Sequence, residues 1–169
     1  MDPQQLEQAK GAGRTALMYA GAAAGAYFVI DLLSKIPVIG LLFFCVNFFL
    51  VLGAYFGIAY YITPRLATPP SGPSKGMAAL WPSIGVAVVT TACFLVAVLV
   101  AGIIGIAIGA GLSGSNSAFG SAVGGTLGLV ISLILFAILG LIVGTGISFL
   151  GTYVALGRNQ NIQPAAPPY

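Results

Sequence analysis

The sequence contains no histidine, and only three of its 169 residues are acidic. The acids are Asp2, Glu7 and Asp31, and none of them lies in the middle of a long apolar run. General acid–base catalysis and metal binding depend mainly on His, Asp, Glu and Cys side chains. The shortage of these groups predicts a protein that is not an enzyme, with no catalytic residue, no metal site and no bound cofactor.

Charge of either sign is scarce along the whole chain. Charged residues make up 5% of the sequence and hydrophobic residues 59%, whereas an ordinary soluble domain has about 25% charged residues. So few charges cannot cover a soluble surface, but side chains that face lipid should be apolar. The composition therefore predicts an integral membrane protein in contact with membrane lipids. The six basic residues are scattered singly, which argues against a nucleic-acid partner.

Cysteine is also rare, and proline is confined to certain regions. Cys45 and Cys93 both lie in apolar runs without CxxC spacing, so they are interpreted as small packing residues. The ten prolines all fall outside the interiors of the expected spans, and five of them lie in residues 63–82. This pattern predicts an extended polar loop over 63–82. It also gives no indication of the broken helices that are found in many transporters.

Long apolar runs are what the sequence has in abundance. A helix needs about 20 apolar residues to cross a bilayer. The runs predict an all-α bundle of four transmembrane helices, at residues 15–33, 37–62, 83–110 and 123–156. A polar segment over 1–14, in which Gly11 and Gly13 would interrupt a short surface helix, precedes this domain, and a proline-rich tail over 157–169 follows it.

The distribution of basic residues predicts the orientation of the bundle. Four spans place both termini on one side, and five of the six basic residues fall on that side, namely Lys10, Arg14, Arg65, Lys75 and Arg158. The other side has only Lys35, spaced to pair with Asp31. Because basic residues concentrate in cytoplasmic segments, we expect an N-in, C-in protein of the bacterial cytoplasmic membrane, with cytoplasmic termini.

The uncharged stretch GLSGSNSAFGSAVGG, residues 111–125, is the second expected connection on the outer side. A phosphate-binding glycine loop would need the GxxxxGK[ST] pattern. The stretch contains no lysine, so it is interpreted as a turn at the membrane surface.

Small residues four positions apart recur in every expected span. This spacing places them along one helix face and creates a groove in which another helix can approach closely. The pattern predicts glycine-rich helix interfaces, within the chain or with another chain. The predicted helix-packing residues are Gly21, Gly25, Gly53, Gly57, Gly105, Gly109, Gly124, Gly128, Gly140 and Gly144.

A few polar and aromatic residues have further predicted roles. Asn47 is the most costly polar side chain to leave unpaired within a span, so we expect an interhelical hydrogen bond there, or else a contact with a polar ligand or a pore. Amphipathic rings prefer the headgroup region. The predicted interfacial anchors are Trp81, Tyr60, Tyr61 and Arg65.

These features together favour a non-catalytic role. The leading hypothesis is an accessory or scaffold subunit that packs against other transmembrane subunits or against copies of itself. Hydroxyl and glycine residues in the third and fourth spans leave open an oligomeric channel or carrier for a small uncharged or apolar solute. A lipid-binding or membrane-organising protein is the third alternative.

Overall fold

The protein is all-helical, as described by a computed structural model for residues 3–34, 40–65, 75–112 and 115–160. Its elements are α1 (Pro3–Ser34), α2 (Gly40–Ile62), the short 3-10 helix η1 (Thr63–Arg65), α3 (Lys75–Leu112) and α4 (Ser115–Gln160). Each of the four α-helices includes a stretch that is long and apolar enough to cross a membrane. The chain is therefore a multi-pass membrane protein, as its composition predicts.

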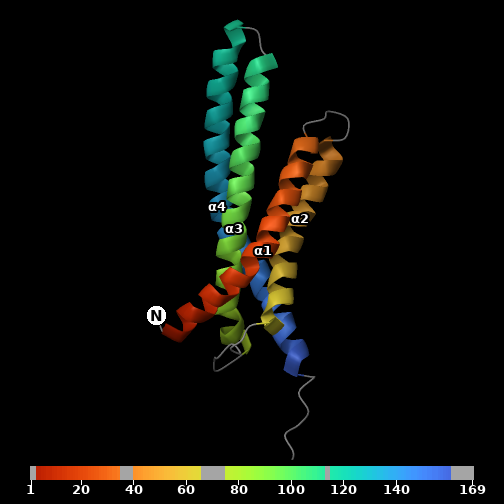
Figure 1. Ribbon diagram of the computed structural model, residues 1–169, viewed down its shortest axis with the longest axis vertical. Coiled ribbons are helices and arrows are strands. Elements are labelled where there is room, and N and C mark those ends of the chain that lie inside the picture. Colours follow the sequence, from red (N-terminus) through yellow and green to blue (C-terminus); the bar gives the residue numbers. More distant parts are fainter. Residues whose placement is uncertain (1–2, 35–39, 66–74, 113–114, 161–169) are drawn as a thin grey trace, which may run out of the picture.

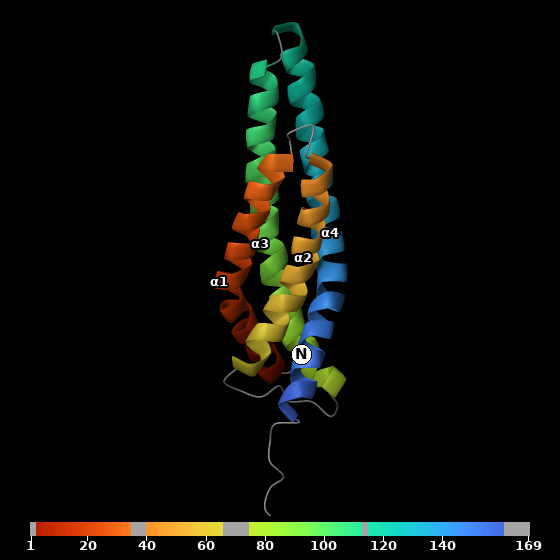
Figure 2. The same cartoon turned by 90° about the vertical axis from the view of Figure 1, so that its right-hand side faces the viewer.

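The helices form two hairpins of unequal length, α1–α2 and α3–α4 (Figure 1). Pro3, η1 and Gln160 lie at the same end of the bundle, which we call the terminal end, and the α3–α4 hairpin extends beyond α1–α2 at the opposite end (Figures 1 and 2). α2 has 23 residues and α4 has 46, or about 34 Å and about 69 Å at 1.5 Å per residue. Because the hydrocarbon core is about 30 Å thick, α4 must tilt or protrude from it.

α1 begins at Pro3 and continues through Gly11 and Gly13 without interruption, unlike the broken polar segment expected from the sequence. Gly13 is buried against α3, where a Cβ atom would lie 3.0 Å from Val89 Cγ2 and 3.3 Å from the Gly85 carbonyl oxygen. A glycine in a helix costs about 1 kcal/mol relative to alanine. The close contact with α3 offsets this cost, since it requires a residue without a side chain.

α3 begins at Lys75, within the expected polar loop, and contains Pro82 inside the helix. The expectation of an extended loop over 63–82 is therefore wrong for residues 75–82, which are helical. Proline cannot donate the helical hydrogen bond to the carbonyl oxygen four residues before it, which here belongs to Ala78. Here the buried Ser83 hydroxyl donates a hydrogen bond to the Leu80 carbonyl oxygen at 2.7 Å.

Most of the expected connection at 111–125 is helical, because α3 ends at Leu112 and α4 begins at Ser115. No described glycine has a positive φ, so these residues do not need a glycine-specific turn conformation. Glycines instead allow α3 and α4 to approach closely. A Cβ atom at Gly102 would overlap the Leu129 side chain, and one at Gly125 would lie 3.0 Å from Ile106 Cγ1.

The core near the terminal end is built from alanines. Ala12, Ala16, Ala20 and Ala24 recur every four residues on α1 and are all buried. The first three pack in one cluster with Ile58, Ala59 and Ile62 of α2 and Val86 of α3. Their small side chains let α1 lie close to its neighbours, which is the main source of attraction between helices in lipid.

A second region of the core is aromatic and centres on Tyr55 and Phe94, both nearly inaccessible. Phe94 contacts Tyr27 of α1 edge-on, with ring centroids 5.4 Å apart. It also packs at 6.2 Å against Phe136 of α4. Rings from all four helices therefore meet at this level.

Tyr55 connects three helices through polar as well as apolar contacts. Its hydroxyl lies 2.7 Å from Thr91 Oγ1 on α3, and its carbonyl oxygen accepts a hydrogen bond from Ser148 Oγ on α4 at 3.3 Å. Its ring fills the space beside two glycines of α4. A Cβ atom at Gly144 would lie 2.5 Å from Tyr55 Cε1, and one at Gly140 would lie 3.2 Å from the hydroxyl oxygen.

Replacement of Gly144 by leucine should therefore destabilise the bundle. The new side chain would collide with the buried Tyr55 ring, and overpacking of this kind costs roughly 1–3 kcal/mol. We expect Gly144→Leu to lower the free energy of unfolding of the detergent-solubilised protein by that amount, as measured by denaturant titration.

The matched control is Gly146→Leu, on the same helix two residues away. Gly146 is exposed and has no described atom within 4 Å of a Cβ position, so the stability of this variant should stay near that of the wild type. Equal stability of the two variants would contradict the placement of Tyr55 against Gly144.

Candidate functional site

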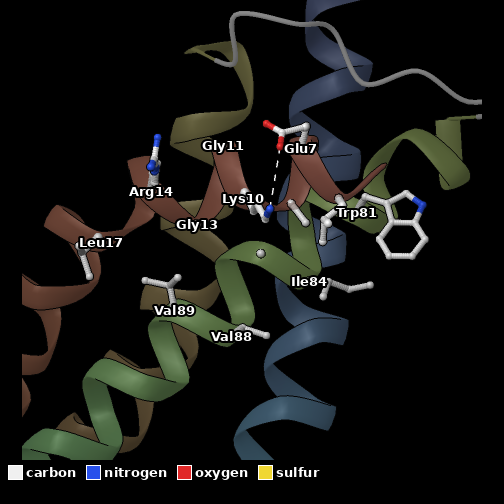
Figure 3. Close-up of a pocket in the computed structure, with 13 residues that line it drawn as sticks. Glu7, Lys10, Gly11, Gly13, Arg14, Leu17, Trp81, Ile84, Val88 and Val89 are labelled. Carbon is white, nitrogen blue, oxygen red and sulfur yellow. Dashed lines mark ion pairs between the residues drawn. The ribbon is translucent and has the colours of Figure 1, made fainter. Parts of the chain in front are cut away.

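A pocket of about 700 Å³ lies between residues 6–17 of α1 and residues 81–89 of α3, toward the terminal end of the bundle. Residues on α1 and α3 form all of its lining. Figure 3 shows Lys10 over the middle of the pocket, with Trp81 toward one end and Leu17 toward the other. The pocket therefore combines charged, aromatic and aliphatic side chains.

The floor of the pocket is made by the closest approach of α1 and α3. A Cβ atom at Gly85 would overlap the Ala9 carbonyl oxygen, so this contact requires glycine on α3. Gly13 meets the same turn of α3 from the α1 side. Gly11 also lines the pocket, but open space surrounds its Cβ position. The pocket thus owes its depth to three positions without side chains.

The rim of the pocket carries more positive than negative charge. Lys10, Arg14 and Glu7 all line it. Lys10 Nζ lies 3.9 Å from Glu7 Oε1, and their side chains are 61% and 79% exposed. Such a surface ion pair contributes only about 0–1 kcal/mol. Glu7 therefore neutralises the rim only in part, and one excess positive charge remains.

The apolar flank of the pocket opens toward the outside of the bundle. Leu17 and Val88 are about half exposed, and both line the pocket. Trp81 is half-buried at its edge, in keeping with the predicted position of an aromatic ring near a membrane surface. The pocket thus spans a boundary between charged and apolar surroundings.

The structure places the predicted packing glycines in two different environments. Gly140 and Gly144 lie against Tyr55. Six others have no described atom within 4 Å of a Cβ position, namely Gly21, Gly25, Gly53, Gly57, Gly105 and Gly128. Gly109 and Gly124 belong to α3 and α4, but their surroundings lie outside the described part of the structure.

Sequence spacing missed several glycines that do form close contacts within the chain. Gly13, Gly85, Gly102, Gly125 and Gly151 all meet atoms of a neighbouring helix. A Cβ atom at Gly151, for example, would lie 2.5 Å from the Phe56 carbonyl oxygen. These glycines are not among the packing residues predicted from the four-residue spacing. Nothing else in the sequence distinguishes them from the exposed glycines.

Asn47 is buried in α2, but the hydrogen bond predicted for it is not formed by its side-chain oxygen. Asn47 Oδ1 has no hydrogen-bond partner among the described residues. The same holds within the described helices for the hydroxyl oxygens of Thr90 and Thr152. Burial at these positions therefore does not by itself provide a hydrogen-bond partner.

The predicted interfacial tyrosines take part in contacts at the terminal end. The Tyr60 hydroxyl accepts a hydrogen bond from Arg158 Nη1 at 2.7 Å, which joins the end of α2 to the end of α4. Tyr61 meets Tyr19 of α1 edge-on, with ring centroids 5.3 Å apart. The backbone of Arg65 ends η1, while its side chain and the whole of Lys35, the predicted partner of Asp31, lie outside the described residues.

The described residues bring together no group of three His, Cys, Asp or Glu side chains that could hold a metal ion. Two features are therefore the candidates for function, namely the pocket at the terminal end and the glycines that face away from the bundle. Comparison of the chain with protein-family models, with curated proteins and with solved structures finds no match.

Proposed function

We propose that this protein is a non-catalytic membrane subunit that assembles side by side with other transmembrane helices, in copies of itself or in other subunits. The observation that carries this proposal is the presence of glycine pairs that no described neighbour fills. Gly21 and Gly25 form such a pair on α1, and Gly53 and Gly57 form another on α2.

Each pair lies on the helix face that points away from the core. On α1, Ala16, Ala20 and Ala24 face the bundle and are buried, whereas Gly21 and Gly25 are exposed. On α2, Tyr55 and Ala59 are buried, and both glycines are again exposed. Since residues four apart share a helix face, each pair forms a shallow groove along the outer surface.

Such a groove favours association because it lets another helix come into close contact. Apolar side chains gain no hydrophobic free energy when they move from lipid into a helix interface. In lipid, helices associate through close van der Waals contact and hydrogen bonds. Large side chains beside the grooves can reach a partner helix, since Met18 on α1 and Phe49 on α2 are 73% and 70% exposed. The outer surface therefore combines grooves with projecting side chains.

An oligomeric channel or carrier for a small uncharged solute is the second candidate. It is favoured by the buried oxygen atoms of Asn47, Thr90 and Thr152, which have no partner among the described residues. A small polar solute that enters the bundle would offer these buried groups a hydrogen-bond partner. Solute flux into liposomes that contain the purified protein would support this candidate over a purely structural subunit.

Leucine substitutions in the outward pairs test the assembly proposal. We expect Gly21→Leu/Gly25→Leu and Gly53→Leu/Gly57→Leu to weaken association at least tenfold without loss of helix content, because each would fill a groove but collide with no described atom. The measurements are Förster transfer between labelled copies in liposomes and co-purification from gentle detergent.

The control for these variants is Gly146→Leu/Gly157→Leu on α4, where open space also surrounds both positions. This variant should associate like the wild type. A wild-type chain that stays monomeric in lipid and purifies without a partner would refute the proposal, and so would unchanged association of both groove variants.

We also propose that the terminal end faces the cytoplasm. The basic residues Lys10, Arg14, Arg65, Lys75 and Arg158 all belong to helical segments at that end, and positive charge concentrates on the cytoplasmic side of membrane proteins. The orientation also explains why residues 111–125, at the opposite end, carry no charge.

Accessibility to a membrane-impermeant maleimide tests this orientation. The natural Cys45 and Cys93 are free thiols, so both are first replaced by alanine. Ser115→Cys, at the start of α4, should then react in intact cells, and Ser71→Cys, in the segment outside the described residues, should react only after permeabilisation. The reverse pattern, or labelling of both from one side, would contradict the proposed orientation.

A further inference from the structure

We propose that the pocket at the terminal end binds the headgroup of an anionic phospholipid from the adjacent leaflet. Lys10 and Arg14 would contact the headgroup phosphate, and an acyl chain would lie along Leu17 and Val88 on the open flank. This site goes beyond the proposed assembly role, because one copy of the chain contains all of its described lining residues.

The order of side chains along the pocket matches the order of groups in a phospholipid. Along α1 the charged residues Glu7 and Lys10 come before Leu17, and along α3 Trp81 comes before Val88 (Figure 3), so Leu17 and Val88 lie toward the same end of the pocket. A phospholipid likewise changes from charged to apolar over its headgroup and glycerol. A free polar metabolite would leave the apolar flank without a partner.

The charge of the rim selects an anionic headgroup. Lys10 and Arg14 outnumber Glu7, and the long 3.9 Å pair leaves the Lys10 ammonium group with donors for another acceptor. Arg14 also lines the pocket, and its exposed side chain extends from α1 on the side away from α3 (Figure 3). Its guanidinium group offers several donors that fit phosphate oxygens. Each basic residue near an anionic surface should raise the affinity about fivefold.

The position of Gly11 permits a direct test of occupancy. Gly11 lines the pocket, and no described atom lies within 4 Å of its Cβ position. A leucine there would occupy the hollow without collision with the chain. Leucine is also a better helix former than glycine, so Gly11→Leu should fold at least as well as the wild type.

Trp81 is the only tryptophan in the sequence, so its fluorescence reports on this pocket alone. The protein is reconstituted in phosphatidylcholine vesicles with a small fraction of brominated phosphatidylglycerol or brominated phosphatidylcholine, since bromine quenches tryptophan on contact. We expect half-maximal quenching at a mole fraction of the anionic lipid at least fivefold lower than that of the zwitterionic lipid.

Matched variants separate a specific site from general attraction to charge. Gly11→Leu should abolish the preference for the anionic lipid, whereas Gly146→Leu, the same change at an open position on α4 outside the pocket, should retain it. Lys10→Gln and Arg14→Gln should each reduce the preference about fivefold. Arg158→Gln removes an equal charge at the terminal end outside the pocket and should leave it unchanged.

Three results would overturn the proposal. Equal quenching by the two lipids would show that the pocket has no charge preference. Retention of the preference in Gly11→Leu, or equal loss in Gly146→Leu or Arg158→Gln, would show that the pocket is not its source. Relief of quenching by millimolar free glycerol phosphate would assign the site to a soluble phosphate compound instead of a lipid.

Discussion

Helices that are apolar all round gain no hydrophobic free energy when they meet inside a membrane, so they must gain close contact. This constraint explains the main features of the bundle. α1 approaches its neighbours through four buried alanines, and α4 approaches Tyr55 where Gly140 and Gly144 lack side chains. Because helices in lipid approach each other at small residues, a glycine pair without a neighbour indicates a place where another helix can pack. On the outer faces of α1 and α2 such pairs leave grooves that no described residue fills.

Composition and hydropathy were sufficient to predict the fold class, because every helix that crosses a bilayer needs about 20 mostly apolar residues. The exact helix bounds were harder to predict. Pro82 lies inside α3 with the Ser83 hydroxyl bonded to the Leu80 carbonyl oxygen, and α1 passes through Gly11 and Gly13. Proline and glycine are expected to interrupt helices on local grounds. At Pro82 and Gly13, burial against neighbouring helices outweighs that local preference.

The choice between helix faces was beyond the sequence. α1 carries one stripe through Ala16, Ala20 and Ala24 and another through Gly21 and Gly25, and only the first faces the core. Both stripes have the same spacing, so periodicity cannot rank them. Tyr55 was likewise not singled out from the other aromatic residues of α2, because its central position depends on Thr91 and Ser148, which are distant in the chain. The pocket beside Lys10 and Trp81 depends on the same kind of long-range pairing.

These helices have hydrocarbon as their natural surroundings, and the behaviour of the protein without lipid or detergent is the most direct test of this claim. The measurement is sedimentation and circular dichroism of the purified protein after complete removal of detergent and lipid. Because large apolar side chains such as Met18, Phe49 and Ile142 face outward, the account predicts aggregation in plain buffer and a monodisperse helical protein when lipid is restored. A folded, monodisperse protein in plain buffer would contradict it.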